Sequence, residues 1–294
     1  MKIVQDFSGM DIEVTESYEA VSRRAEQLIV ADLKRRPDLI LCASAGSTPT
    51  RTYELLAARA VLQPGLFEKM RVLQIDEWGG LAPGNLATCE YDLRSKLLEP
   101  LRITKERYVG FRSAVTDPVG ECARIAEWLV SNGPIDICLL GLGVNGHVAM
   151  NEPAESATPQ PHLAKLSRAS LQHPMLKQMA LKPKYGLTIG LRDILSSRRI
   201  LLLVNGSHKR AALERLMVPQ VTTRFPASFL WLHRQATILC DREAAPARDH
   251  RSFSGRLFKS TTSPARRRRS HDAQFFSEGT VDKRSTLKVS GRST

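Results

Sequence analysis

The chain of 294 residues is 42% hydrophobic and 25% charged, a composition that suits a soluble globular protein of one large or two ordinary domains. No stretch approaches the roughly 18 apolar residues of a membrane span, and the first residues lack the apolar core of a signal peptide. These features argue against a membrane protein and a secreted one, so we expect a cytoplasmic protein without a membrane partner.

The basic charge is concentrated at one end of the chain. Formal net charge is +13, and residues 247–294 account for +8 of it, with 12 Lys+Arg against 4 Asp+Glu. Because this segment is rich in Ser, Thr and Arg without an apolar period, we predict a folded domain over 1–246 and a disordered basic tail over 247–294. The arginine run at 266–269 could contact nucleic acid. We favour instead a solvated extension, or one translated out of its original frame, and expect no nucleic-acid partner.

Five cysteines bear on the compartment and on metal binding. They are odd in number and show neither a CxxC spacing nor a Cys/His ligand pattern. Cys42, Cys138 and Cys240 lie in apolar, strand-like runs. We therefore expect reduced, mostly buried thiols and no metal site.

Apolar periodicity predicts alternating strands and helices over most of the chain. In chain order we expect short edge strands within 1–14, a helix at 18–33 capped by Thr15, a strand at 39–43, a helix at 51–60, a strand at 72–75, a helix at 87–98, a loop and strand within 100–112, a helix opening at Asp117, strands at 135–140, 185–190 and 200–204, a helix through Leu216, a short helix at 228–232 and a last strand at 237–240. This alternation predicts a three-layer, Rossmann-like α/β domain with a largely parallel sheet. Residues 155–183 lack a clear period, which favours a functional lid.

The most informative stretch is 135–153, IDICLLGLGVNGHVAMNEP. An apolar run bounded by glycines is typical of a strand buried on both faces, and ligands of open α/β sheets bind beyond the carboxyl ends of such strands. The loop delivers Asn145, His147 and Glu152 to that place. The alternative is an ordinary glycine turn in which His147 satisfies a local hydrogen bond.

Two further strand ends are suited to a phosphate. SAGSTPT at 44–50 places a glycine and hydroxyls at a helix N-terminus, where backbone N–H groups and the helix dipole attract anions. NGSHK at 205–209 repeats this pattern and adds Lys209. The GK[ST] element of a Walker loop is missing. For the first loop, a plain helix cap without a ligand is the alternative.

Asp76 and Glu77 directly follow the strand at 72–75, in crevice position. Adjacent side chains of an extended chain point in different directions, so the two acids are not expected to share one role. The alternative is that Asp76 caps the next turn and Glu77 is a solvated charge.

Together these clusters resemble the glucosamine-6-phosphate deaminase and 6-phosphogluconolactonase family, over roughly residues 39–241. The pattern GxNGHxxxNEP, at 143–153, is typical of its deaminases, whereas the lactonases usually lack the NEP continuation. IDEWGGL, YDLRSKLLEPL and PASFLWLH are more similar to the galactosamine-6-phosphate isomerases, or deaminases, than to the glucosamine branch. The resemblance implies a metal-independent and cofactor-independent isomerisation of an amino sugar phosphate that releases ammonia.

The resemblance also implies roles for individual residues. Asp76 matches the base that moves the proton between carbons, His147 the group that assists ring opening, and Glu152 its orienting and protonating partner. Asn145 stands where some members have Asp. A phosphate-binding arginine in the lid has no secure match here, and Lys177 is the candidate. The implied phosphate ligands are Ser44, Gly46, Ser47, Thr48 and Lys209.

The chemistry supports the same assignment. Opening the ring of a 2-amino aldose and moving its C2 proton to C1 need an acid–base group and a base of raised basicity, which His147 and Asp76 supply. Two alternatives stay open: a hydrolase of sugar-phosphate lactones, which needs no C2 base, and a non-catalytic protein that binds sugar phosphates. The sequence leaves open the sugar epimer and whether the chain forms a homo-oligomer.

Overall fold

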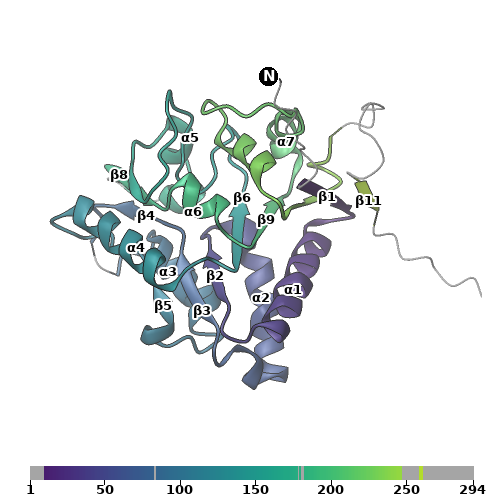
Figure 1. The fold of residues 1–294 in the computed structure, drawn as a ribbon, viewed down its shortest axis with the longest axis horizontal. Coiled ribbons are helices and arrows are strands. Elements are labelled where there is room, and N and C mark those ends of the chain that lie inside the picture. Colours follow the sequence, from purple (N-terminus) through teal and green to yellow (C-terminus); the bar gives the residue numbers. More distant parts are fainter. Residues whose placement is uncertain (1–9, 83, 178, 180–181, 247–257, 261–294) are drawn as a thin grey trace, which may run out of the picture. The chain divides into compact units, whose positions relative to one another are not determined.

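The computed structural model describes residues 10–82, 84–177, 179, 182–246 and 258–260. Its main sheet contains β1 (Met10–Thr15), β2 (Ile40–Ala43), β3 (Arg71–Gln74), β5 (Tyr108–Val109), β6 (Ile137–Gly141), β9 (Arg199–Val204), β10 (Ala236–Asp241) and β11 (Phe258–Ser260). Their order across the sheet is β11-β1-β10-β9-β6-β2-β3-β5, and every neighbouring pair is parallel (Figure 1). The prediction of a largely parallel sheet is confirmed.

Helices cover both faces of this sheet. The α-helices are α1 (Tyr18–Arg35), α2 (Ser47–Leu62), α3 (Cys89–Leu93), α4 (Pro118–Asn132), α5 (Arg168–Leu171), α6 (Leu191–Leu195) and α7 (Arg210–Leu216). Shorter or irregular turns are η1 (Pro64–Phe67), η2 (Arg94–Leu98), which is π-helical, η3 (Lys105–Arg107), η4 (Pro174–Leu176), η5 (Ser207–Lys209) and η6 (Pro226–Leu232).

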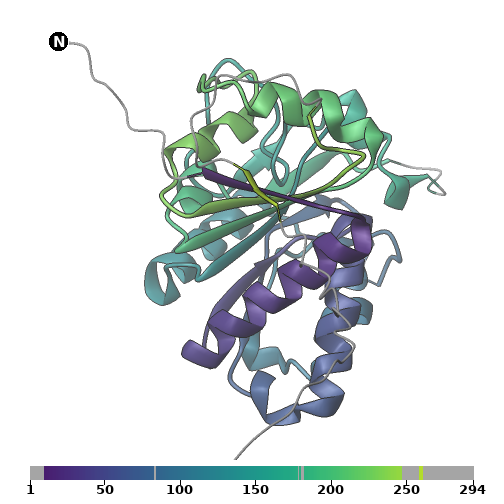
Figure 2. The ribbon, with the colours of Figure 1, turned by 90° about the vertical axis from the view of Figure 1, so that its right-hand side faces the viewer.

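Two hydrophobic cores lie on opposite faces of the sheet. Because successive residues of a strand face opposite sides, Ile40 and Cys42 of β2 join the core that includes α4 and α7, and Leu41 joins the core that includes α1 and α2. Figure 2 shows the purple α1 on one side of the sheet and the green helices on the other. The predicted three layers are therefore present.

A second sheet was not predicted. It consists of β4 (Asp76–Gly79), β8 (Tyr185–Thr188) and β7 (His162–Ala164), in the antiparallel order β4-β8-β7. Ile75 links it to the main sheet, because its N–H donates to Ala43 O and its carbonyl accepts from Ile189 N–H, both at 3.1 Å. The strand expected at 185–190 thus belongs to this small sheet.

Several predicted boundaries are wrong for physical reasons. The cap of α1 is Ser17, whose Oγ accepts from Ala20 N–H, because Thr15 is still paired within β1. Helix α2 begins at Ser47 rather than Arg51, since Pro49 is compatible with a first helical turn. The cap predicted at Asp117 is confirmed.

Two longer segments also differ in part from the predictions. The helix expected at 87–98 is divided into α3 and η2. Residues 155–183, which lack a clear period in the sequence, contain β7, α5 and η4. The predicted disordered tail, 247–294, lies outside the described residues except for β11, a strand that was not expected.

All five cysteines are free and buried, as expected from their apolar surroundings. Cys42 of β2 and Cys138 of β6 are register partners in adjacent strands. In the described part of the chain, no helix is long and apolar enough to cross a membrane.

Candidate active site

The strand order creates a crevice at the carboxyl ends of β2 and β6. From β2 the chain continues to β3 and β5 on one side, whereas from β6 it continues to β9 and β10 on the other. Ligands of open α/β sheets bind where the strand order reverses in this way. A cavity of about 340 Å³ lies here, and its wall includes the predicted residues Ser44, Gly46, Ser47, Thr48, Asp76, His147 and Lys209.

Asp76 stands at the start of β4, where the chain leaves the parallel sheet. It is 9% exposed. Burial raises the pKa of its carboxyl to about 7, the neighbouring Glu77 adds to the rise, and a hydrogen bond with Cys89 opposes it. A carboxylate of this basicity is better suited than an ordinary aspartate to remove a proton from carbon.

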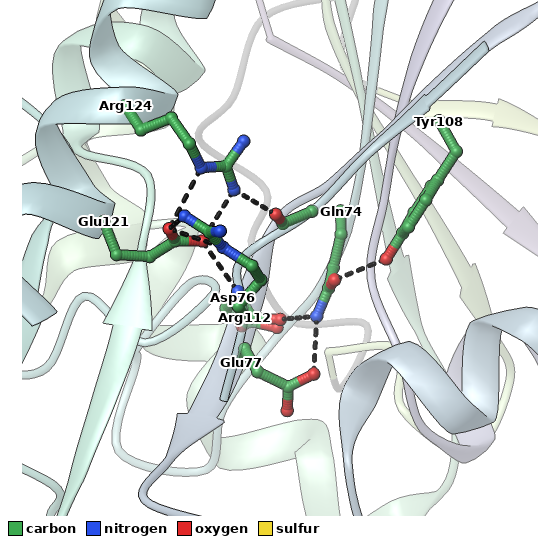
Figure 3. A network of polar contacts seen from close by, with 8 residues as sticks. Gln74, Asp76, Glu77, Tyr108, Arg112, Glu121 and Arg124 are labelled. Atoms are coloured by element: carbon green, nitrogen blue, oxygen red, sulfur yellow. Dashed lines mark hydrogen bonds and ion pairs between the residues drawn. The ribbon is translucent and has the colours of Figure 1, made fainter. Parts of the chain in front are cut away.

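The second acid of the pair, Glu77, is completely buried and does not line the cavity. Its Oε1 accepts from the N–H groups of Trp78 and Cys89 at 2.7 and 2.8 Å, and its Oε2 accepts from Glu90 N–H at 2.8 Å. Oε2 also accepts from Gln74 Nε2 at 2.9 Å (Figure 3). The alternative of a solvated charge is therefore wrong. Glu77, and not Asp76, accepts hydrogen bonds from the N–H groups in the first turn of α3.

His147 is the end of a hydrogen-bonded chain that starts at Glu152. Asn145 Nδ2 donates to Glu152 Oε2 at 2.9 Å, and its Oδ1 lies 2.7 Å from His147 Nδ1. An amide oxygen only accepts, so Nδ1 carries a proton in this arrangement and Nε2 keeps a free lone pair. Asn145 and Glu152 do not line the cavity themselves but orient the imidazole that does.

Two glycines make room for this loop. A Cβ on Gly143 would lie 2.5 Å from His147 Nδ1, and a Cβ on Gly146, whose φ is +86°, would lie 2.1 Å from the Phe225 ring. The glycine density of the loop is thus required by the close approach of the imidazole and by a left-handed backbone.

The charge state of His147 depends on its surroundings. Burial lowers the pKa of His147, the Glu152 carboxylate acts in the opposite direction, and Lys209 adds to the lowering. The net direction is downward, which favours a neutral imidazole at pH 7. Glu152 is also connected to the segment around α5, because it accepts from Ser167 N–H at 3.2 Å and from the Ser170 hydroxyl.

The predicted phosphate loop lies at the N-terminus of α2, with one difference from expectation. The Gly46 N–H donates to Asp92 Oδ2 at 2.9 Å, so this amide is already occupied in the structure. Across the cavity, burial lowers the pKa of Lys209. The Ser44 hydroxyl is buried and has no hydrogen-bond partner in the described part of the chain, which leaves a polar group available to a ligand.

His173 of the cavity wall was missed. His173 lies 3.5 Å from the position of a Cβ on Gly46, and its ring centroid is 5.8 Å from that of Trp78. Burial lowers the pKa of His173 to about 4, and His147, when it is protonated, and Lys209 add to the lowering. His173 belongs to the aperiodic segment, where only the following proline marks a turn. The candidate Lys177 does not line the cavity.

The cavity thus combines a basic carboxylate, a neutral imidazole and an ammonium group beside a helix N-terminus. Among the residues that the structure describes outside its gaps, no group of three or more His, Cys, Asp or Glu side chains is placed to hold a metal ion. These features define an α/β protein with acid–base side chains and a loop suited to an anion at its switch point.

Comparison with known proteins identifies the family. The family of glucosamine-6-phosphate isomerases/6-phosphogluconolactonase matches residues 13–239. A protein of Escherichia coli (strain K12) named "Putative deaminase AgaI" is 36% identical over 222 residues, 76% of this chain and 88% of that protein. Glucosamine-6-phosphate deaminase 1 of Bacillus subtilis (strain 168) is 32% identical over 244 residues, 81% of this chain and all of that protein. The chain belongs to this enzyme family.

Solved structures agree with this assignment. A monomeric glucosamine-6-phosphate deaminase, described as a missing link of the NagB superfamily, is 31% identical with a TM-score of 0.75, and the match covers 80% of this chain and 98% of that one. The 6-phosphogluconolactonase from Trypanosoma brucei is 19% identical with a TM-score of 0.64, over 80% of this chain and 97% of that one, and shows the shared fold alone.

Proposed function

We propose that this chain converts an amino sugar phosphate, galactosamine 6-phosphate or glucosamine 6-phosphate, into a ketohexose 6-phosphate and ammonia. The observation that carries the proposal is the presence of Asp76, His147 and Lys209 on one cavity wall. Galactosamine 6-phosphate is the preferred substrate, because the IDEWGGL and PASFLWLH segments are more similar to the galactosamine branch of the family.

The first step is ring opening. The phosphate binds between the N-terminus of α2 and Lys209, which fixes the sugar and leaves its reacting carbons near the acid–base groups. His147 Nε2, with its free lone pair, takes the proton of the O1 hydroxyl and returns a proton to the ring oxygen. Asn145 and Glu152 hold the imidazole in the tautomer that this transfer requires.

The second step moves a proton between carbons. Asp76 removes the C2 proton and delivers it to C1, and a proton moves from the amino group to O1, so that the aldehyde carbon becomes an alcohol and the amino-bearing C2 becomes an imine. Water adds to that imine, ammonia leaves, and the ketone remains. A pKa of about 7 makes Asp76 basic enough to remove the proton and acidic enough to return it.

A substrate panel tests this proposal against the lactonase alternative. We expect purified enzyme to release ammonia and ketose phosphate from at least one of the two amino sugar phosphates, and to leave a 6-phosphogluconolactone substrate unhydrolysed above background. No ammonia from either amino sugar at high enzyme concentration would reject the proposal. Binding of the sugar phosphates without turnover would favour the non-catalytic alternative.

The phosphate anchor is tested separately. We expect Lys209→Met to raise KM for the sugar phosphate by about 10- to 100-fold, since a charge-assisted contact to phosphate is lost. Lys177→Met is the matched control, because Lys177 lies outside the cavity wall, and its KM should match that of the wild type. Equal KM values for all three proteins would rule out Lys209 as a phosphate ligand.

We also propose that residues 1–246 form the complete catalytic domain and act in the cytoplasm. The site residues all precede residue 210, and five free thiols suit a reducing compartment. A chain truncated after Pro246 loses β11 at the edge of the sheet but keeps every residue of the site, so it should keep the kcat of the full chain. A large fall in kcat would show that the tail takes part in catalysis.

A further inference from the structure

We propose that Glu77 is a positioning residue for Asp76: its buried, ionised carboxylate fixes β4 against α3 and places a permanent negative charge behind the base. The inference rests on the proposed function, in which Asp76 moves the C2 proton. Glu77 does not line the cavity, so it acts through its neighbour and not on the substrate.

The hydrogen bonds of Glu77 favour its ionised form. Each of its two oxygens accepts from two N–H groups, and the four donors come from β3, from β4 and from the first turn of α3. An N–H group cannot accept, so a proton on either oxygen would face a donor. Burial raises the pKa of Glu77, and these four hydrogen bonds oppose that rise.

Gln74 connects the Glu77 carboxylate to the backbone of Asp76 through hydrogen bonds. Tyr108 OH donates to Gln74 Oε1 at 2.6 Å, which fixes the orientation of the amide. Gln74 Nε2 can then donate both to Glu77 Oε2, at 2.9 Å, and to the carbonyl of Asp76, at 2.7 Å (Figure 3). The backbone of Asp76 and the carboxylate of Glu77 are therefore held by the same oriented Gln74 amide.

Four titratable groups face Asp76 from the elements packed around it: Glu77 of β4, Cys89 of α3, Cys42 of β2 and Tyr53 of α2. Burial raises the pKa of both thiols and of the phenol, so these three are neutral at pH 7. Across the cavity stand Lys209, His147 and His173. Of the four groups packed around the base, Glu77 alone is charged, and a negative charge at this place opposes loss of the Asp76 proton.

A second buried carboxylate provides a matched control. Glu121 of α4 is 2% exposed and accepts from the N–H of Arg112 at 2.8 Å and from the guanidinium groups of Arg112 and Arg124 (Figure 3). The pKa of Asp76 carries no contribution from this group. Glu77→Gln and Glu121→Gln therefore both remove a buried carboxylate. Only Glu77→Gln removes the charge next to Asp76.

The experiment compares the pH dependence of kcat/KM in wild type, Glu77→Gln and Glu121→Gln. We expect the acidic limb of Glu77→Gln to move to lower pH by about one unit, and that of Glu121→Gln to stay at the wild-type position although its melting temperature falls. An unmoved limb in a folded Glu77→Gln enzyme would reduce Glu77 to a structural role and overturn the proposal.

Tyr108→Phe keeps the proposal testable if Glu77→Gln does not fold. It removes the hydrogen bond that orients Gln74, and we expect a smaller shift of the acidic limb in the same direction. An unmoved limb would again count against the proposal.

An infrared titration of the Asp76 carbonyl band, identified by its loss in Asp76→Asn, needs no turnover. We expect the band of Glu77→Gln, or of Tyr108→Phe, to titrate at lower pH than that of wild type. An unshifted band overturns the role of Glu77. A shifted band in an enzyme that releases no ammonia would reject only the proposed function.

Discussion

The two polar walls of the cavity are built in opposite ways. On the β4 wall, Asp76 stands in a dry environment in front of Glu77, a carboxylate whose donors are mainly backbone amides. On the wall formed by the loop after β6, His147 is oriented by side chains, Asn145 and Glu152, and Glu152 is in turn held by hydroxyl and amide groups near α5.

This difference shows two ways of setting a proton affinity. Burial and a fixed like charge raise the pKa of Asp76, and the rigid backbone around it leaves few ways to relax. Burial lowers the pKa of His147, but a chain of exchangeable side-chain contacts decides which nitrogen holds the proton. Substitutions on the β4 wall should therefore change the reactivity of Asp76 and the stability of the fold. Those on the wall formed by the loop after β6 should change mainly the orientation of the His147 imidazole.

The largest effect is expected from Asp76→Asn, which removes the base. We expect kcat to fall by about 10²- to 10⁴-fold, the usual contribution of a positioned acid–base group. Wild-type kcat/KM should itself fall as the pH drops below about 7, because Asp76 is then protonated. Asp193→Asn, which changes another acid with a raised pKa outside the cavity, should keep the wild-type kcat.

The same substitution should stabilise the fold at alkaline pH. Asp76 has a pKa of about 7 when folded and 3.8 as an ordinary aspartate, so the folded chain binds more protons between these values. Its ionisation therefore costs stability progressively as the pH rises through this range, and the full cost applies above it. The melting temperature of Asp76→Asn should exceed that of wild type at pH 8 and approach it near pH 4. A melting temperature of Asp76→Asn below that of wild type at pH 8 would contradict the destabilising burial of the Asp76 carboxylate.

A smaller effect is expected from Glu152→Gln on the loop wall. A glutamine amide has one acceptor oxygen instead of two, so it cannot accept both from Asn145 on one side and from Ser167 and Ser170 on the other. The imidazole then loses its fixed orientation. We expect kcat/KM to fall by about 10- to 100-fold, less than the full acid–base contribution. Glu155→Gln, at an exposed acid paired with Arg224, should leave kcat/KM unchanged. Similar losses in both variants would refute a specific role for Glu152.

The smallest effect is expected from Asn145→Asp. A carboxylate 2.7 Å from Nδ1 favours the imidazolium, so the pKa of His147 should rise and the pH range of the neutral ring should move upward. Imidazole titration by NMR measures this shift. Unchanged ring-opening kinetics would show that the position only orients its neighbours, whereas a rate gain above tenfold would show that a carboxylate takes part in proton transfer.

The buried parallel strands and much of the site could be predicted from the sequence. β6 and β9 are continuous apolar runs, and such runs identify strands that are covered on both faces. Asp76, His147 and Lys209 lie in the segments that follow β3, β6 and β9, so their meeting at one edge follows from the parallel order.

The small sheet could not be predicted in the same way. Its strand β4 reads DEWG and has no apolar alternation, because its pairing with β8 depends on a segment more than 100 residues away in the sequence. The burial of Glu77 is hidden for a similar reason, since a charged residue is buried only when distant donors pair with it. His173 was missed because its segment has no period and its place is set by contacts with Trp78 and Gly46.

The buried free thiols of Cys42 and Cys138 can report how often the core opens. They lie in adjacent strands and are completely shielded from solvent. Both side chains lie in the core that includes α4 and α7, so a thiol reagent can reach them only when this core opens, and the labelling rate measures that opening. A sugar phosphate that binds above these strands stabilises the closed chain by mass action and lowers the labelling rate. The dependence of this rate on ligand concentration reports the affinity without any turnover.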